Sequence, residues 1–195
     1  MKPNPPSAIS VIALTALFLA GCSSVGVKTS MGPPENIFSA AEMEGEWLLG
    51  VTGEDERQTY HVKRLSDGAL RFVTVSWIEN ENAYEMIEID AQLLRIDGNP
   101  YLQLTPQTAE DPYYFYRIER KTPEELIIRP PNLSLFVAAI EEGRLSGKVN
   151  RDRNGNPSSV LLSDGPELKS YLGNTPSRPL FPAGSKWEMR ATRIN

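Results

Sequence analysis

Alternation of apolar and polar side chains is the feature that most constrains the fold of this chain. In the segment 85–93, every second residue is apolar and would share one face of a strand: Ile87, Ile89, Ala91 and Leu93. The pattern recurs over 100–105 and again over 186–192. A period of two marks β-strands that bury one face. These segments therefore predict a β-rich domain.

Dipeptides suited to tight turns separate the alternating segments. They are Asp67-Gly68, Asp97-Gly98 and Asn154-Gly155, which tolerate the positive φ angles of short hairpin loops. Successive hairpins predict a mostly β single domain, either a closed or half-closed antiparallel barrel or a two-sheet sandwich. The barrel is the first expectation because closure removes exposed sheet edges.

Two short helices are expected within this β-rich domain. Apolar residues at 133, 136, 137 and 140 have helical spacing, and Gly143 follows as a stop signal. Farther on, Asp164 and Glu167 have the spacing of a capping box ahead of the apolar stripe 168–172, which Gly173 follows.

The amino terminus has the pattern of an export signal. Lys2 precedes an apolar run over 11–20, about half the length of a membrane-spanning helix. The run ends in Leu19-Ala20-Gly21-Cys22, which resembles the lipobox of bacterial lipoprotein precursors. The resemblance implies cleavage before Cys22, lipidation of the Cys22 sulfur and acylation of the new amino terminus.

The same resemblance implies a place in the bacterial cell envelope, with the membrane as a partner through the lipid on Cys22. Ser23 follows the cysteine where an Asp would suggest inner-membrane retention, so the family rule favours the periplasmic side of the outer membrane in a host with two membranes. The next residues are rich in Ser, Gly, Pro and Thr. The expected organisation is a signal peptide over 1–21, a flexible tether over 22–40 and a β-rich globular domain over 41–195.

A three-residue element opens the first expected strands. Gly45-Glu46-Trp47 resembles the Gly-x-Trp element of lipocalin-type barrels, in which the Trp plugs one end of the barrel. The series of hairpins that follows is compatible with that family. The resemblance implies a lipocalin-like barrel and, as one function, transport of a small apolar ligand.

Composition and charge exclude several classes of function. The formal net charge is −5 and cleavage of the signal removes only Lys2, so no nucleic-acid partner is expected. A single cysteine excludes internal disulfides and zinc sites built on cysteine pairs. We expect no metal and no cofactor.

Candidate catalytic residues have simpler structural interpretations. His61, the only histidine, lies on the polar side of its expected strand. The pairs Glu124-Glu125 and Glu141-Glu142 are adjacent, which suits a solvated surface better than acid–base catalysis. The loop that begins at Asp152 lacks the spacing of a calcium loop and is interpreted as a polar hairpin turn.

The segment Tyr113-Tyr114-Phe115-Tyr116 would be apolar on both faces of a strand. Such a strand is either buried on both sides as part of the core, or it forms the wall of a ligand cavity or a docking surface; the buried interpretation is favoured. We expect the barrel to be mostly filled by bulky inward residues: Trp47, Tyr60, Ile87, Ile89, Leu93, Leu102, Leu104, Tyr114, Tyr116, Ile118, Trp187 and Met189.

These observations lead to a ranking of functions. The first is a lipid-anchored envelope protein that binds another envelope component or contributes to envelope integrity, without enzymatic activity. The alternative is a lipocalin-like carrier of a small apolar ligand. A hydrolase comes last, because the sequence supplies no recognisable catalytic set.

Overall fold

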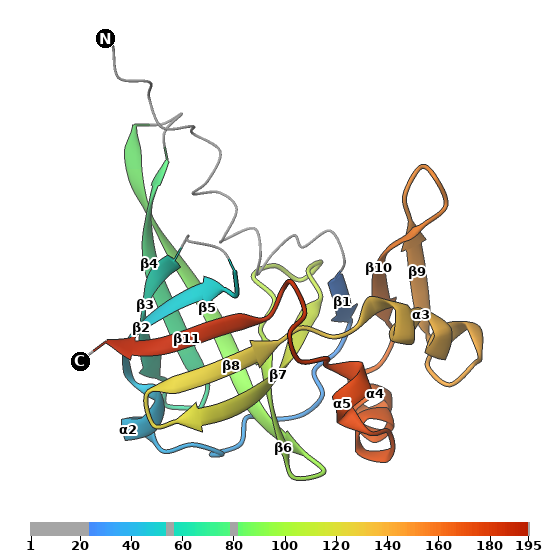
Figure 1. The fold of residues 1–195 in the computed structure, drawn as a ribbon, viewed down its shortest axis with the longest axis horizontal. Coiled ribbons are helices and arrows are strands. Elements are labelled where there is room, and N and C mark those ends of the chain that lie inside the picture. Colours follow the sequence, from blue (N-terminus) through green and yellow to red (C-terminus); the bar gives the residue numbers. More distant parts are fainter. Residues whose placement is uncertain (1–23, 54–56, 79–81, 195) are drawn as a thin grey trace.

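The computed structural model describes residues 24–53, 57–78 and 82–194. Most of these residues form β-strands, which Figure 1 shows together with the short helices. The elements, in chain order, are β1 (Ser24–Val27), α2 (Ala40–Met43), β2 (Gly45–Val51), β3 (Arg57–Arg64), β4 (Leu70–Ile78), β5 (Ala83–Ile96), β6 (Asn99–Leu104), β7 (Tyr113–Thr122), β8 (Glu125–Arg129), α3 (Leu133–Glu141), β9 (Gly147–Arg151), β10 (Pro157–Leu162), α4 (Gly165–Asn174), α5 (Ser177–Leu180) and β11 (Met189–Ile194).

The central feature of the fold is a closed antiparallel barrel of eight strands. The strands follow one another in the order β6-β5-β4-β3-β2-β11-β8-β7, and pairing between β6 and β7 closes the sheet. This closure confirms the barrel expected from the sequence and rules out the two-sheet sandwich. It also leaves the barrel strands without the open edge that an unclosed sheet would have.

The predicted hairpin turns lie where the sequence placed them. Asp97 and Gly98 both have positive φ, 47° and 74°, and join the paired residues Ile96 and Asn99. Two consecutive positive φ angles characterise the tight turn that matches the twist of neighbouring strands.

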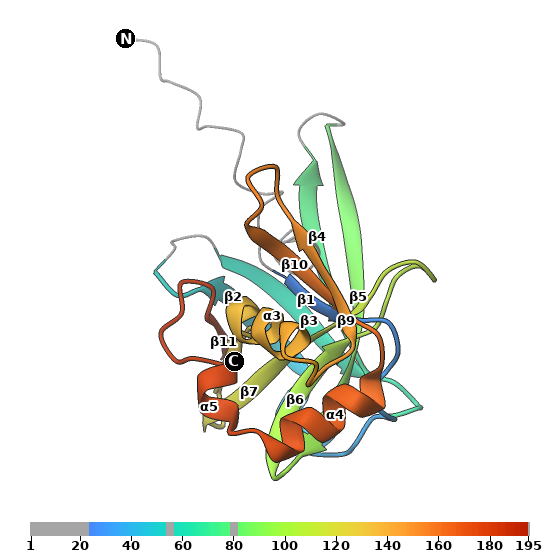
Figure 2. The same ribbon diagram turned by 90° about the vertical axis from the view of Figure 1, so that its right-hand side faces the viewer.

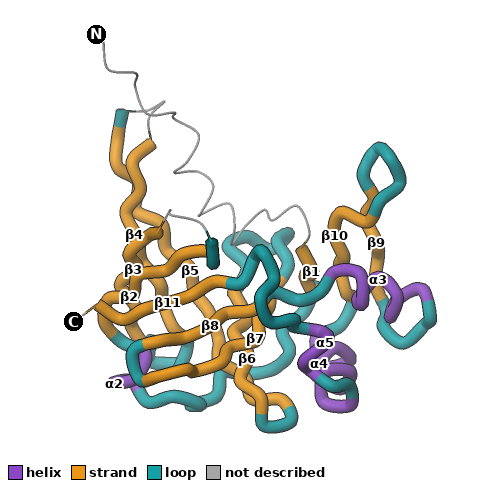
Figure 3. The backbone as a smooth tube through the Cα atoms, in the orientation of Figure 1, coloured by secondary structure: helices purple, strands orange, loops and turns teal. Residues whose placement is uncertain are grey.

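A second layer of structure covers one side of the barrel. Strand β1 pairs in antiparallel fashion with the start of β7 and in parallel fashion with β10, which in turn forms a hairpin with β9. Figure 3 shows this small sheet together with α3, α4 and α5 on one side of the barrel, whereas α2 lies at its lower end. We call β1, β9, β10 and these three helices the outer layer.

The outer layer and the barrel each have an apolar core. The barrel core consists of inward-facing side chains, and its members are Met43, Trp47, Leu49, Val51, Tyr60, Val62, Leu70, Ile89, Ala91, Leu93, Leu102, Leu104, Tyr116, Ile118, Leu126, Ile128, Met189 and Ala191. The outer core lies between the outside of β5, β6 and β7 and the outer layer, and it includes Val25, Val27, Leu94, Ile96, Tyr101, Phe115, Phe136, Leu162, Leu168 and Phe181.

The two predicted helices are α3 and α4. The Asn132 side chain caps α3, and the Asp164 carboxylate caps α4 by accepting a hydrogen bond from the Glu167 backbone N–H at 3.1 Å. The Glu167 carboxylate accepts hydrogen bonds from Ser146, which precedes β9, so it ties the start of α4 to the β9–β10 hairpin. The single-turn helices α2 and α5 were not predicted.

The prediction of a flexible tether over 22–40 is wrong for the part of that segment that the structure describes. Val25 and Val27 of β1 are buried in the outer core, and the Lys28 backbone N–H donates to the Leu162 carbonyl at 3.0 Å. The Met31 backbone N–H donates to the side chain of Gln103, a fully buried residue of β6. Composition suggested a linker, but four residues with two buried valines form a strand. The folded domain therefore includes Ser24–Val27 and does not begin only at residue 41.

A smaller correction concerns the last strand. The alternation over 186–192 placed Trp187 among the inward residues, but β11 begins only at Met189. Trp187 precedes the strand, is half-buried, and lies against the Lys186 ammonium rather than inside the barrel.

Candidate functional site

The interior of the barrel is the first candidate for a binding site. One of its ends is closed. Trp47 of β2 is 3% exposed and its indole Nε1–H donates to the Met43 carbonyl at 2.9 Å. Met43 is the last residue of α2, so this bond joins the helix to the barrel interior. An ion pair between Glu42 of α2 and Arg120 of β7 adds a second link. Helix α2 and Trp47 together close this end of the barrel.

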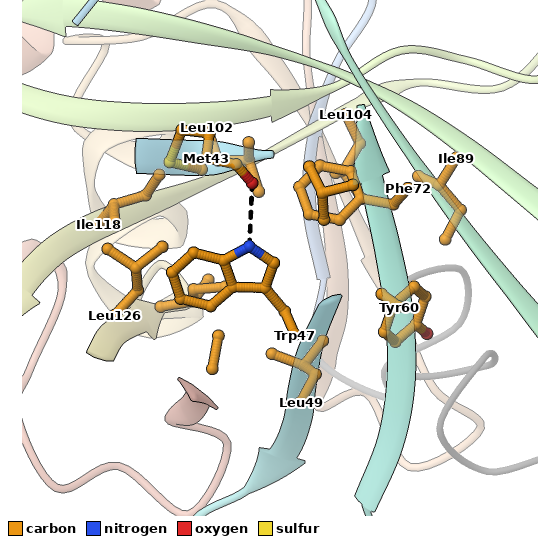
Figure 4. A pocket seen from close by; sticks show the side chains of 13 residues that line it. Met43, Trp47, Leu49, Tyr60, Phe72, Ile89, Leu102, Leu104, Ile118 and Leu126 are labelled. Atoms are coloured by element: carbon orange, nitrogen blue, oxygen red, sulfur yellow. Dashed lines mark hydrogen bonds between the residues drawn. The ribbon is translucent and has the colours of Figure 1, made fainter. Parts of the chain in front are cut away.

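The middle of the barrel is apolar and nearly full. Figure 4 shows the side chains around the remaining space, with Trp47 on one side and Tyr60 and Phe72 on another. The rings of Tyr60 and Phe72 meet edge to face with their centroids 6.4 Å apart. The space that remains has a volume of about 30 Å³, whereas sites for ligands of drug-like size occupy roughly 300–1,000 Å³. The expectation of a mostly filled interior is thus confirmed.

A polar layer lies on the inner face of the neighbouring strands β3 and β4, beyond Tyr60 and toward the β4–β5 hairpin. The Gln58 amide donates to the hydroxyls of Thr74 and Ser76 at 2.9 and 2.7 Å, and both hydroxyl residues are 3% exposed. The Tyr60 hydroxyl donates to the Gln58 carbonyl oxygen at 3.5 Å. The layer pairs polar groups whose burial without partners would be costly.

Ionisation inside the barrel is suppressed by burial. Desolvation raises the pKa of Tyr60 to about 12 and also raises the pKa of Tyr116. Both phenols therefore remain neutral at physiological pH. With both phenols neutral, the described residues that line the interior offer no group poised as a general acid or base near pH 7.

The aromatic strand is buried on both faces, as expected from its sequence. Tyr116 points into the barrel core, whereas Phe115 is fully buried on the outside and its ring meets those of Phe136 and Phe181. Tyr114 packs against the barrel core and Tyr113 against the outer core. This strand is the wall shared by the two cores rather than the lining of a large cavity.

The structure separates the other candidate residues. His61 is exposed on the outer face of β3. Glu125 pairs with Arg190 at 3.0 Å and Glu141 with Arg151 at 2.8 Å, both on the surface. These residues lie on different elements and form no common site.

The Asp152 loop is the turn of the β9–β10 hairpin. The Asp152 carboxylate accepts hydrogen bonds from the backbone N–H groups of Asn154 and Asn156, both at 2.8 Å. The bond from Asn156 is the largest of several causes that hold the pKa of Asp152 below its ordinary value. The interpretation as a polar hairpin turn is confirmed.

A buried ionic cluster was missed by the sequence analysis. Arg129 at the end of β8 donates from Nε to the Glu188 carboxylate at 2.8 Å and pairs through Nη1 with Glu119 of β7. Its side chain is 9% exposed and that of Glu188 is 11% exposed. The cluster ties the segment before β11 to the outer surface of the barrel. The residues come from three separate segments, so no local pattern indicated their association.

A larger depression lies on the surface beside α4. Its volume is about 440 Å³, and it lies between Arg144 and the residues 167–175. The Arg144 guanidinium is already paired with Glu142 and with the Tyr171 hydroxyl. The guanidinium at the edge of this depression is therefore already engaged by neighbouring side chains, so a ligand would have to compete with them for it.

The signal peptide over 1–21 and Cys22 lie outside the described residues. In the described ranges, His, Cys, Asp and Glu side chains do not gather in groups of three or more suited to a metal ion. In the same ranges, each helix is too short or too polar to cross a membrane. No protein-family model matches the chain, and no significant similarity to a curated protein or a solved structure was found.

Proposed function

We propose that this chain is a lipid-anchored protein of a bacterial cell envelope whose barrel domain is a non-enzymatic binding or structural module. The Leu19-Ala20-Gly21-Cys22 sequence at the end of a short apolar run supports the anchor. One acyl chain binds a membrane only marginally, whereas several chains on one residue anchor stably, at about 0.8 kcal/mol per buried CH₂ group. In a host with two membranes, Ser23 favours the periplasmic side of the outer membrane.

The observation that carries the choice of a module over a carrier is the filled interior. A cavity of about 30 Å³ has room for one or two water molecules, not for a lipid or a drug-sized ligand. The bulky side chains that fill the rest of the barrel interior belong to several strands and to α2. A ligand inside the barrel would have to displace well-packed core residues, which costs stability.

A non-enzymatic role is supported by the placement of the reactive side chains. His61 lies on the outside of the barrel, and the surface carboxylates Glu125 and Glu141 are engaged in ion pairs. A hydrolase would need a nucleophile, a base and an orienting group within hydrogen-bond reach of one another.

A carrier remains the second candidate, because the cavity is lined entirely by apolar or aromatic residues. A fluorescent apolar probe separates the two functions. The module predicts no tight one-to-one binding by the wild type. Tight binding that is abolished in a Trp47→Ala variant of nearly unchanged stability would establish the carrier instead.

The anchor itself is tested by Cys22→Ser in the full precursor, with Ser23→Ala as the matched control. We expect the Cys22→Ser precursor to stay uncut and to incorporate no labelled fatty acid, while the control is processed and labelled. Normal processing of the Cys22→Ser chain, together with a wild type that partitions into the aqueous phase of a detergent extraction, would contradict the anchor.

A further inference from the structure

The link between the expected lipid and the folded domain is very short. Strand β1 begins at Ser24, so only Ser23 separates it from Cys22. At about 3.3–3.6 Å per extended residue, the Cα atoms of Cys22 and Ser24 lie within roughly 7 Å of each other. Strand β1 is held on both sides, by β7 and by β10. The domain would therefore lie directly on the membrane.

The register of β1 indicates which side of the domain faces the lipid. Ser24 is opposite Ser159 in the parallel pair with β10, so the start of β1 lies beside the start of β10, next to the β9–β10 turn. Figures 1 and 2 show this turn and the β4–β5 hairpin projecting to the same side of the molecule. In both views the β5–β6 turn lies at the opposite side, and Figure 1 shows the β7–β8 turn in the lower part of the barrel.

The β4–β5 hairpin carries an exposed apolar stripe on that side. Its outer face presents two cross-strand pairs, Val75 with Met86 and Trp77 with Tyr84. Val75, Met86 and Tyr84 are 60%, 63% and 74% exposed, and the Trp77 and Tyr84 rings contact each other with centroids 4.8 Å apart. We call these four residues the hairpin stripe. They include three of the four large hydrophobic residues that are exposed in the described part of the chain; the fourth is Ile194.

The opposite face of the same hairpin explains why the stripe points outward. Thr74 and Ser76 face the polar layer of the barrel and are buried there. Because side chains alternate along a strand, Val75 and Trp77 must point away from the barrel. Neighbouring apolar side chains on the outside of a barrel are typical of a surface that contacts a protein or a membrane.

We propose that the hairpin stripe is a membrane-contact surface, which rests on the lipid surface beside the anchor at Cys22. This inference rests on the proposed lipid anchor and adds the orientation of the domain. Trp and Tyr are favoured at membrane–water interfaces, where an aromatic ring is half-immersed. The chain is acidic, with a formal net charge of −5, so the contact suits a zwitterionic surface better than an anionic one.

The experiment uses the complete mature, lipidated protein with one added thiol. Cys22 is the only natural cysteine and its sulfur is blocked by lipid, so Met86→Cys can be labelled uniquely with an environment-sensitive dye. Glu124→Cys, at the exposed β7–β8 turn, is the matched control. Both proteins are placed in phosphatidylcholine vesicles at high dilution in lipid, with and without a lipid that carries a shallow nitroxide quencher.

The proposal predicts a shift of the label at 86 to shorter wavelength and quenching by the nitroxide lipid, with neither effect at 124. A third protein, Val75→Glu in the Met86→Cys background, should lose both effects while its melting temperature and its flotation with vesicles are unchanged. Partial replacement of phosphatidylcholine by an anionic lipid should reduce the quenching.

Three results would overturn the proposal. If the protein floats with vesicles but the label at 86 is not quenched, the lipid anchor is supported and the membrane contact of the hairpin stripe is contradicted. A wavelength shift that depends on protein concentration rather than on lipid assigns the stripe to contact between copies of the chain. A mature chain that carries no lipid and does not float removes the anchor, and the proposal with it.

Discussion

The two apolar cores of this protein differ in the parts of the chain that build them. The barrel core is formed by one face of strands that largely follow one another as hairpins, from β2 to β8, and by β11. The outer core joins β1, near the amino terminus, to β9, β10 and the helices of the last third of the chain. Most neighbouring strands of the barrel are therefore joined by local hairpins and only β11 comes from far along the chain, whereas the outer layer depends on the pairing of β1 with the distant strand β10.

The two cores also differ in where their buried polar side chains lie and in what those side chains hold in place. Polar side chains enter the barrel at the Gln58 layer. On the outside, Gln103 is fully buried, accepts from the Met31 backbone N–H and donates to the Ser30 hydroxyl, and it donates a third hydrogen bond to the Gln92 side chain of β5. A buried amide with all its partners specifies position better than apolar packing alone does. The amino-terminal segment is thus held in one place on the barrel wall.

The largest expected effect concerns the barrel core. Trp47→Ala removes a buried indole and its hydrogen bond to Met43, and should lower the free energy of unfolding by about 4 kcal/mol. Denaturant unfolding measures the change. Trp187→Ala is the matched control, because Trp187 lies outside both cores and its loss should cost no more than about 1 kcal/mol. Equal losses in the two variants would show that the interior is not tightly packed.

The second prediction concerns the ionic cluster that ties the segment before β11 to β7 and β8. Arg129→Met leaves the buried Glu188 carboxylate without its guanidinium and should cost about 3 kcal/mol. Adding Glu188→Gln removes the unpaired charge, so the double variant should be more stable than the single one. Strictly additive losses in this double-mutant cycle would show that the two side chains do not interact.

The third prediction concerns the packing of residues 29–30 against the start of α4. A Cβ atom at Gly165 would overlap the Ser30 carbonyl, and the Gly165 backbone N–H donates to the Thr29 hydroxyl at 2.8 Å. Gly165→Ala should therefore cost about 2 kcal/mol, as overpacking does.

Helix α4 supplies its own control for that variant. Gly173, in the same helix, has no atom closer than 3.8 Å to the site of a Cβ, so Gly173→Ala should stabilise the helix by up to about 1 kcal/mol. The two alanine variants should move the midpoint of denaturant unfolding in opposite directions. A Gly165→Ala variant as stable as the wild type would mean that residues 29–30 do not pack on α4.

The smallest effect is a dependence of stability on pH. Hydrogen bonds from Lys121 and then Arg129 lower the pKa of Glu119 from 4.5 to about 2. A depressed carboxyl pKa stabilises the fold above the unfolded pKa, and this contribution is lost as pH falls from about 4.5 toward about 2. Because Glu119 is 33% exposed, solvent screening keeps the contribution below about 1 kcal/mol. Glu119→Gln should flatten stability over this window in urea titrations, and an unchanged slope would contradict the assignment.

The sequence predicted those parts of the fold that depend on local patterns. Alternation located β5 and β6, and the dipeptide Asp97-Gly98 located the turn between them, because side-chain period and turn geometry are properties of short segments. The aromatic run of β7 indicated burial on both faces. The filled interior followed from the bulk of the inward residues.

Other parts of the fold could not be predicted because their cause lies far along the chain. The composition around Ser24–Val27 is typical of a linker, and the strand that pairs with it in parallel, β10, lies far along the chain. Arg129 and Glu188 are brought together by the pairing of β11 with β8, which no local pattern in the sequence indicates. Trp187 was assigned inward because the alternation continues through it, although the strand begins two residues later. Cys22 rests on a motif and lies outside the described residues, so its lipidation stays a prediction.

Hydrogen exchange measures whether the chain just after Cys22 is part of the folded domain. The Lys28 N–H donates to the Leu162 carbonyl and the Met31 N–H to Gln103. Both amides should exchange orders of magnitude more slowly than free peptides and approach the protection of the barrel strands. Exchange of both at the rate of an unstructured chain, with the barrel strands protected, would restore the flexible tether and contradict this account.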